Sequence, residues 1–160
     1  MKQALFTINK WLLFACVSMY FGTGWSLVLF SFPIADSLTP DNYYYGFVPQ
    51  VTAATHFFTY MTQLMSLCAC IWIWEEWHQK SKWFGIGILF AVVLATSLTL
   101  IYIFPYNKQL ADGIKDAVVL KDVLHKWMNL NRIRVSIWTV QWLLMVWYFA
   151  KYYTKKQLTI

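Results

Sequence analysis

The chain has 160 residues, of which 59% are hydrophobic and only 12% are charged, and its formal net charge is +6. A soluble domain usually has about 25% charged residues, so this composition indicates an integral membrane protein that has the lipid bilayer as its partner. The positive charge predicts no nucleic-acid partner, because the lysines cluster at the ends of apolar segments and leave no basic face.

Four segments are mostly apolar over the roughly 20 residues that a helix needs to cross a bilayer. They comprise residues 11–32, 51–74, 83–104 and 131–153. We therefore expect an all-α fold, an integral membrane four-helix bundle that forms a single transmembrane domain over residues 1–160.

Lysines before the first span, between the second and third spans and at the end of the chain predict the orientation. The loop between the first and second spans has two Asp and no Lys or Arg. The positive-inside rule then places both termini in the cytoplasm, and we expect a multi-pass protein of a bacterial inner membrane. The lysines of the loop between the third and fourth spans run against this pattern.

The first span contains "FGTGWS", with Gly22 and Gly24 near the middle of the membrane. Glycines at this depth allow a second helix, or a ligand, to approach the backbone closely. Trp25 follows them and is a candidate for the wall of an apolar cavity.

The second span carries a polar stripe at steps of three and four residues, formed by Thr52, Thr55 or His56, Thr59, Gln63, Ser66 and Cys70. In a membrane such a stripe is expected to face protein or a water-filled cavity, although the same residues also join helices by simple packing. His56 is the only histidine within a span, which makes it a candidate general base.

The third span ends near Tyr102 and Asn107, at the predicted outer level of the membrane. After it, apolar residues recur at helical spacing and predict an amphipathic helix over residues 108–126, in the second outer loop. Asn107 would suit its N-cap, and the helix could continue into the fourth span.

The fourth span begins with two arginines that cannot point the same way, because two residues of helix correspond to a rotation of about 200°. Arg134 shares one face with Trp127, Asn131, Trp138 and Gln141, and is expected to face the bundle. Arg132 is expected to extend to the lipid headgroups. The alternative for both is a simple anchoring role at the membrane interface.

Topology and helical phase together predict a small-molecule site at the outer end of the bundle. Its polar groups would come from His56, Asn107, Asn131 and Arg134 as catalytic candidates. The substrate-binding candidates are Trp25, Gln63, Tyr102, Trp127, Trp138 and Gln141. Aromatic walls with a few polar groups are typical of such sites, although they also occur in ordinary aromatic belts.

Two short elements resemble a known family. "FPYNKQL" resembles a P-x-N-x-x-L element and "WMNLNRIR" a W-x-x-x-N-x-x-R element, and the glycine-bearing first span followed by Pro33 fits the same pattern. Together they resemble the anthrone oxygenase-like family of small four-span membrane proteins. The matching positions are Pro105, Asn107, Leu110, Trp127, Asn131 and Arg134.

The resemblance implies cofactor-independent oxidation of an aromatic, polyketide-like substrate by O2. His56 could remove a proton from an acidic benzylic carbon, and Arg134 with Asn107 or Asn131 could hold the enolate oxygen that forms. We expect no cofactor and no metal. The tyrosine-rich "DNYYYGF" of the first outer loop does not belong to the pattern of the family.

Three other functions remain open. A haem could be held only between His56 and His125, since His78 is expected at the opposite membrane face. The chain could bind an apolar ligand or lipid without chemistry. It could also be a subunit of a homo-oligomer or of a larger membrane complex.

Overall fold

The computed structural model describes residues 2–157, with side chains from residue 3 to residue 152. Lys2, Lys155 and Lys156, which contribute to the prediction of orientation, lie outside the described side chains.

Four long helical segments account for most of the chain. The first comprises α1 (Lys2–Ser26), the π-helical turn η1 (Leu27–Ser31) and α2 (Phe32–Ala35), and the second is α3 (Tyr43–Glu75). The third comprises α4 (Lys82–Leu98), the π-helical turn η2 (Thr99–Ile103) and α5 (Phe104–Asp112), and the fourth is α6 (Ala117–Gln157). Each segment is long and apolar enough to cross a membrane. The predicted all-α four-helix membrane bundle is confirmed, and the chain is an integral multi-pass membrane protein.

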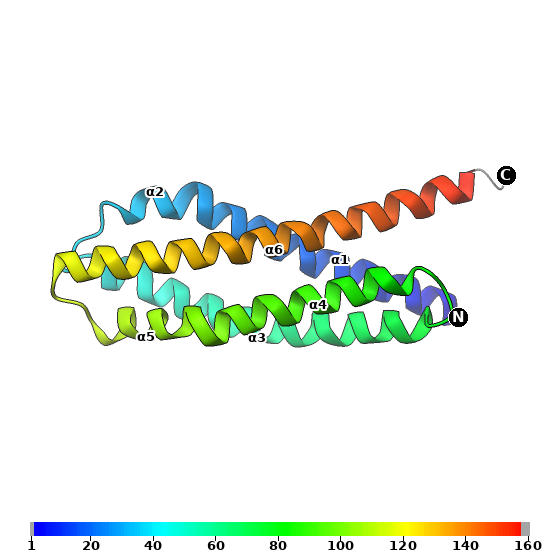
Figure 1. The fold of residues 1–160 in the computed structure, drawn as a ribbon, viewed down its shortest axis with the longest axis horizontal. Coiled ribbons are helices and arrows are strands. Elements are labelled where there is room, and N and C mark those ends of the chain that lie inside the picture. The colour runs from blue at the N-terminus through cyan, green and yellow to red at the C-terminus, as the bar shows by residue number, and fades with distance from the viewer. Residues whose placement is uncertain (1, 158–160) are drawn as a thin grey trace.

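The helices form an elongated bundle in which neighbouring segments of the chain alternate in direction (Figure 1). Both termini lie at one end, together with the turn between α3 and α4. We call this the terminal end. The opposite end, with the connections from α2 to α3 and from α5 to α6, is called the distal end.

Two prolines interrupt the first and third segments in the same way. Pro33 and Pro105 each lie at the start of a short helix that follows a π-helical turn. In these turns Phe32 N–H bonds to the carbonyl of Leu27, and Phe104 N–H bonds to the carbonyl of Thr99. A proline has no N–H for the carbonyl four residues earlier, so a widened turn lets the helix continue across the gap.

The predicted amphipathic helix over residues 108–126 is divided into two parts. Gly113, with φ at 89°, ends α5, and α6 begins at Ala117 and continues into the fourth span. Asp116 caps α6, because its Oδ1 accepts the N–H groups of Val118 and Val119 at 2.7 and 3.0 Å. The predicted capping role of Asn107 is therefore wrong, since Asn107 lies inside α5.

A buried tyrosine holds the break between the two helices. The hydroxyl of Tyr43 donates to the carbonyl of Leu110 at 3.1 Å and accepts the N–H of Ile114 at 2.5 Å. Of the three tyrosines in "DNYYYGF", only Tyr43 is buried, while Tyr44 and Tyr45 are exposed. This loop therefore fastens the distal end of the bundle through one of its tyrosines.

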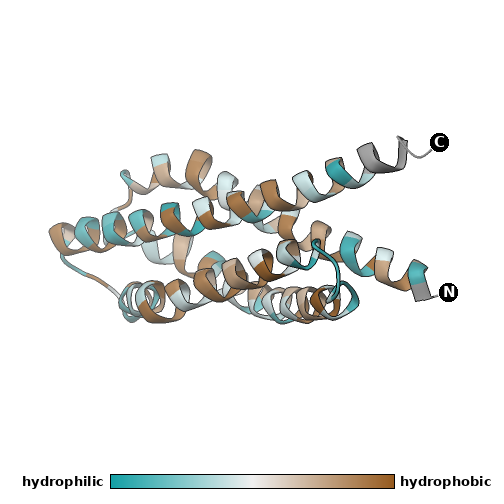
Figure 2. Ribbon diagram, turned by 45° about the vertical axis from the view of Figure 1, so that its right-hand side comes forward, coloured by the Kyte–Doolittle hydropathy of each residue, from teal (hydrophilic) through white to brown (hydrophobic). Residues whose placement is uncertain are grey.

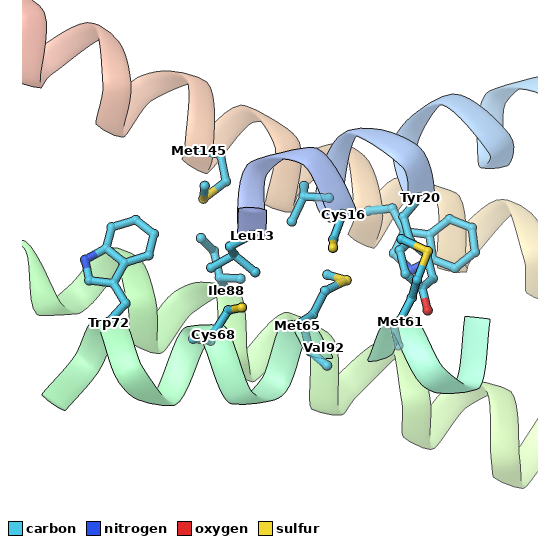
Figure 3. Packing of buried hydrophobic residues seen from close by; sticks show 14 of the residues in the cluster. Leu13, Cys16, Tyr20, Met61, Met65, Cys68, Trp72, Ile88, Val92 and Met145 are labelled. Atoms are coloured by element: carbon cyan, nitrogen blue, oxygen red, sulfur yellow. The ribbon is translucent and has the colours of Figure 1, made fainter. Parts of the chain in front are cut away.

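The main core lies between α1, α3, α4 and α6. Its residues from α1 and α3 interlock along the axis of the bundle, as Leu13, Cys16 and Tyr20 show opposite Met61, Met65 and Cys68 (Figure 3). A second cluster, which includes Phe32, Tyr43, Leu110, Leu124 and Trp127, fills the distal end. Hydrophobic residues predominate along the middle of the helices, and hydrophilic ones gather near the N-terminus and along the distal half of α6 (Figure 2).

Candidate functional site at a buried arginine

Arg134 of α6 extends its guanidinium group into the bundle, toward the π-helical turn η2. Its Nη1 donates to Thr99 Oγ1 at 3.3 Å, and its Nη2 donates to Asn131 Oδ1 on the preceding turn of α6. The guanidinium carbon lies 4.7 Å from the centre of a Trp138 ring, in the arrangement of a cation–π contact. The sequence-based expectation that Arg134 faces the bundle is met.

The positive charge of Arg134 has no carboxylate beside it. Among the described residues the ion pairs are those of Lys10 with Glu75 and Glu76, of His125 with Asp36 and of Lys126 with Asp122. Arg134 Nε is also shielded from solvent and has no hydrogen-bond partner within the described chain. A buried cation with an unused donor is costly in a membrane, so such a group is commonly functional.

A chain of hydrogen bonds joins Arg134 to α5. Asn131 is fully buried, and its Nδ2 donates to the carbonyl of Trp127 at 2.8 Å. The indole N–H of Trp127 donates in turn to Asn107 Oδ1 at 2.7 Å. These bonds bring together four of the predicted site residues, Asn107, Trp127, Asn131 and Arg134, and the cation–π contact adds a fifth, Trp138.

Gly24 of α1 covers the Trp138 side of this cluster. A Cβ atom at Gly24 would lie 2.8 Å from Trp138 Cε3 and 2.9 Å from Val135 Cγ2. Only a residue without a side chain fits here without displacing α6. The close approach that was predicted from the glycines of the first span is therefore present at Gly24, whereas nothing lies within 4 Å of a Cβ at Gly22.

A pocket of about 250 Å³ lies between α3 and α5 at the distal end. His56 and Asn107 both line it, and its other walls are mainly apolar. The remaining lining residues are Phe47, Val48, Val51, Thr52, Thr55, Phe104, Lys108, Leu110 and Ala111. Arg134 does not line this pocket, and the contacts from Asn107 to Arg134 pass through Trp127.

Four predicted substrate-binding residues lie away from this cluster. Trp25 is partly exposed and donates to Thr139 Oγ1 at 3.1 Å, and Gln141 is buried and donates to the carbonyl of Ile88 at 3.2 Å. Tyr102 is 56% exposed, and Gln63 lies on the outer surface of α3. Helical phase explains both exposed positions.

The π-helical turn η2 widens the helix, so that Ile103, rather than Tyr102, follows Thr99 on the buried face. In α3 the buried face is formed by large apolar residues, Met61, Met65 and Trp72 among them, and Gln63 does not share it. The sequence shows the polar stripe of α3 clearly, but it does not show that these apolar residues occupy the inward face.

Arg132 points away from Arg134, as the helical rotation predicts. It is exposed, donates to Asn129 Oδ1 at 2.7 Å and lies 5.4 Å from the centre of the Phe32 ring. It lines a second pocket, of about 240 Å³, together with His125 and Asp36. His56 and His125 therefore line different pockets, and no cluster of three or more His, Cys, Asp or Glu side chains occurs within the described residues.

A second polar cluster, at the terminal end, was missed by the sequence analysis. Lys10 Nζ lies 2.6 Å from Glu76 Oε1 and 2.9 Å from Glu75 Oε2. Glu76 also accepts the indole N–H of Trp72 at 2.8 Å and the hydroxyl of Tyr148 at 3.2 Å. Burial alone would raise the pKa of Glu76, but hydrogen bonds from Lys10, Ser81 and Trp72, foremost that from Lys10, hold its pKa below the ordinary value.

The available signal for this cluster was the position of Lys10 directly before the apolar run and of two adjacent Glu at the end of the second span. Lys10 was interpreted only as a charge of the membrane boundary, and the two Glu were given no role. One cation faces two carboxylates here, and Glu75 Oε2 makes no hydrogen bond within the described chain, so the cluster keeps one net negative charge. Its contacts join α1, the end of α3 and α6 and fasten the terminal end of the bundle.

Comparisons of the chain with protein-family profiles, with curated protein sequences and with solved structures gave no match.

Proposed function

We propose that the protein binds an apolar, aromatic small molecule with an acidic oxygen at the distal end of the bundle, and that Arg134 neutralises this oxygen. The observation that carries the proposal is the Arg134 guanidinium, which is held inside the bundle without a carboxylate and with a free Nε–H. An oxyanion supplies the missing negative charge and the missing acceptor in one group.

The pocket between α3 and α5 suits the apolar body of such a ligand. Its walls include Phe47, Phe104 and Leu110, which complement a flat ring system. Because Trp127 lies between Asn107 and Asn131 in the chain of contacts, we propose that its indole moves as the ligand enters. The ligand oxygen then reaches Arg134, while the Nδ2 group of Asn107, which the bond from Trp127 does not engage, donates a second hydrogen bond.

We further propose that the bound ligand is oxidised by O2, as the resemblance to the anthrone oxygenase-like family implies. His56 would remove a proton from the benzylic carbon, and Arg134 would stabilise the enolate that results. The carbanion would give its electrons to O2 and form a C–O bond. Loss of water from the hydroperoxide leaves a ketone, so that a CH2 group and O2 become a C=O group and water.

Under the positive-inside rule the distal end faces the outside of the membrane, and both termini lie in the cytoplasm. Two observations are compatible with this orientation. Both termini and the turn between α3 and α4 lie at one end, where Lys80 belongs to the turn and Lys82 begins α4. In this orientation the ligand would enter from the outer leaflet or from the space beyond it.

Binding is tested with anthrone under nitrogen, which prevents its oxidation, with purified protein in detergent. We expect anthrone to quench the tryptophan fluorescence of the wild-type protein as it binds. Arg134→Gln should weaken binding about tenfold or more, the loss of one charge-assisted hydrogen bond of about 1.5–3 kcal/mol. Arg132→Gln is the matched control, because it removes the same charge two residues away and should leave the affinity unchanged.

The reaction is tested separately by O2 consumption with anthrone in air. Loss of O2 uptake in His56→Ala with retained binding would support the role of the base. Full turnover in His56→Ala would remove this residue from the mechanism. Binding without any O2 uptake in wild-type protein would favour a carrier or sensor, and equal binding by wild type and Arg134→Gln would refute the site itself.

A further inference from the structure

One face of α3 carries exposed polar residues along the whole span, and its distal member, Thr52, also lines the pocket between α3 and α5. Thr52, Thr59, Gln63 and Cys70 are all exposed. At about 100° per residue they fall within about 40° of one another around the helix. The buried residues Met61, Met65, Cys68 and Trp72 lie about 180° from them and point toward α1 and the other helices of the bundle (Figure 3). We call these four exposed residues the outer stripe of α3.

Gln63 is the member of the outer stripe whose hydrogen-bonding groups find no partner in lipid. The hydroxyls of Thr52 and Thr59 donate to the carbonyls of Val48 and Thr55 on their own helix, at 2.9 and 2.8 Å. The amide of Gln63, by contrast, makes no hydrogen bond with any described residue, and it lies near the middle of the 33-residue helix. A primary amide with two donors and an acceptor is costly in hydrocarbon unless another helix supplies partners.

We propose that the outer stripe of α3 is the interface of a parallel homodimer, with Gln63 of one protomer hydrogen-bonded to the same residue of its partner. Two copies inserted in one membrane with the same orientation place identical residues at the same depth. A two-fold axis along the membrane normal then sets amide against amide, and each donates to the other. The amide is thus complementary to itself.

The rest of the outer stripe fits a second copy equally well. Its four residues include no Asp, Glu, Lys, Arg or His, so two copies meet along them without repulsion between like charges. His56 is exposed and lies about 20° from Gln63 around the helix, so the dimer also brings the two copies of His56 near the interface. Threonine side chains are small enough for two helices to approach closely. An unrelated partner would need its own polar group at the depth of Gln63, whereas a second copy has one there by necessity.

Cys70 provides a built-in test of this arrangement. It lies seven residues after Gln63, two turns along the same face, and it is the exposed cysteine, while Cys16 and Cys68 are buried. In the proposed dimer the two Cys70 side chains face each other at the same depth. Oxidation could then join them, since a disulfide forms when two Cα atoms come within about 7 Å.

The experiment is oxidative cross-linking in native membranes with copper phenanthroline. Each Cys70 thiol releases its proton to water and gives one electron to a copper(II) ion, and the two sulfurs form one disulfide. We expect a covalent species of twice 18.9 kDa in the wild type and none in Cys70→Ser. In the Cys70→Ser background, Leu143→Cys gives a matched control on α6.

Leu143 is exposed and lies at a depth similar to that of Cys70. Tyr148, five residues after Leu143, contacts Glu76, which lies six residues after Cys70, and this contact aligns the two helices. The Leu143→Cys variant should therefore cross-link only at the low rate of random collision. Gln63→Met preserves length and removes the hydrogen bonds. It should lower the dimer association constant about three- to tenfold, as expected for one or two interhelical hydrogen bonds, and slow the cross-linking of Cys70 accordingly.

Four results would overturn the proposal. The first is cross-linking of Cys70 that is no faster than that of Leu143→Cys. The second is a disulfide between Cys70 and a different polypeptide. The third is cross-linking of Gln63→Met as fast as that of the wild type. The fourth is a dimer in native mass spectrometry whose Cys70 thiols stay unlinked after oxidation, which would place the interface on another face.

Discussion

The indole N–H of Trp127 on α6 donates to the Oδ1 atom of Asn107 on α5 across 2.7 Å, and this bond joins the two sequence elements on which the functional interpretation depends. It connects a residue of the pocket wall with the turn of α6 that leads to Arg134. The bond is also the part of the site that has to open if a ligand in the pocket is to reach the guanidinium group.

Trp127→Phe should therefore lower stability without abolishing ligand binding. The variant keeps most of the ring and leaves the Asn107 carbonyl oxygen without its donor, which should reduce the free energy of unfolding by about 1–2 kcal/mol. Thermal unfolding in detergent measures this change. Trp147→Phe is the control, because Trp147 is 60% exposed on the same helix and should tolerate the change. An equal loss in both variants would contradict a specific role of the bond.

Arg134→Met should raise stability while it weakens binding, as Arg134→Gln does. It replaces a buried, unbalanced cation by an apolar side chain of similar length, and comparable replacements of buried charges are often stabilising by about 1–4 kcal/mol. Such an opposition between stability and function is common at binding sites. A lower unfolding midpoint for Arg134→Met would mean that its contacts with Thr99, Asn131 and Trp138 serve mainly the fold.

The two glycines of "FGTGWS" should differ sharply in their tolerance of alanine. A Cβ at Gly24 would collide with Trp138 and Val135, so Gly24→Ala should cost about 1–3 kcal/mol of stability and disturb the ring beside Arg134. Gly22→Ala meets nothing within 4 Å and should be neutral or slightly stabilising. Thermal unfolding of both variants under one set of conditions decides the matter. Equal effects would show that α1 and α6 are not closely packed at Gly24.

Lys10 should be the most sensitive residue of the terminal end. Lys10→Met would leave the carboxylates of Glu75 and Glu76 close together without their cation, at a cost of about 3 kcal/mol. Lys126→Met, which breaks the exposed pair with Asp122, serves as the control and should leave the unfolding midpoint unchanged. If both variants unfolded at the same temperature, the buried cluster would not fasten the bundle.

The same cluster predicts how stability depends on pH. The pKa of Glu76 is lowered in the folded chain, so its contribution is fully present above the ordinary Glu value of about 4.5 and is lost as the pH falls through the lower, folded value. The groups that face it are Lys10, Trp72, Ser81 and Tyr148. We expect Glu76→Gln to flatten the fall of the unfolding midpoint below that pH. An unchanged acid profile would contradict the assignment.

Composition and hydropathy were enough to predict the bundle, because a membrane leaves few alternatives to apolar helices. The 3.6-residue period also separated Arg132 from Arg134 and placed Asn131, Arg134 and Trp138 on one face. These predictions rest on single helices, whose geometry is nearly fixed.

The rotation of each helix about its own axis was harder to predict. Gln63 was assigned to the site, but apolar residues occupy the inward face of α3. Tyr102 was assigned to it as well, but a π-helical turn changes the direction in which the side chain at this position points. The cluster around Lys10 was missed for a related reason. Charges near a membrane boundary are usually solvated, and only the packing of α1 against α3 and α6 shows that this lysine is enclosed.

The central claim, that Arg134 neutralises an acidic oxygen of an aromatic ligand, is tested most directly with 2-naphthol, whose absorption spectrum changes when its hydroxyl ionises. The measurement is the pKa of the bound probe in wild type, Arg134→Gln and Arg132→Gln. If Arg134 contacts the oxygen, the pKa should fall by about one unit or more in the wild type and in Arg132→Gln, since one unit corresponds to about 1.4 kcal/mol, and it should return to the free value in Arg134→Gln. Bound naphthol with the same pKa in all three proteins would contradict the claim.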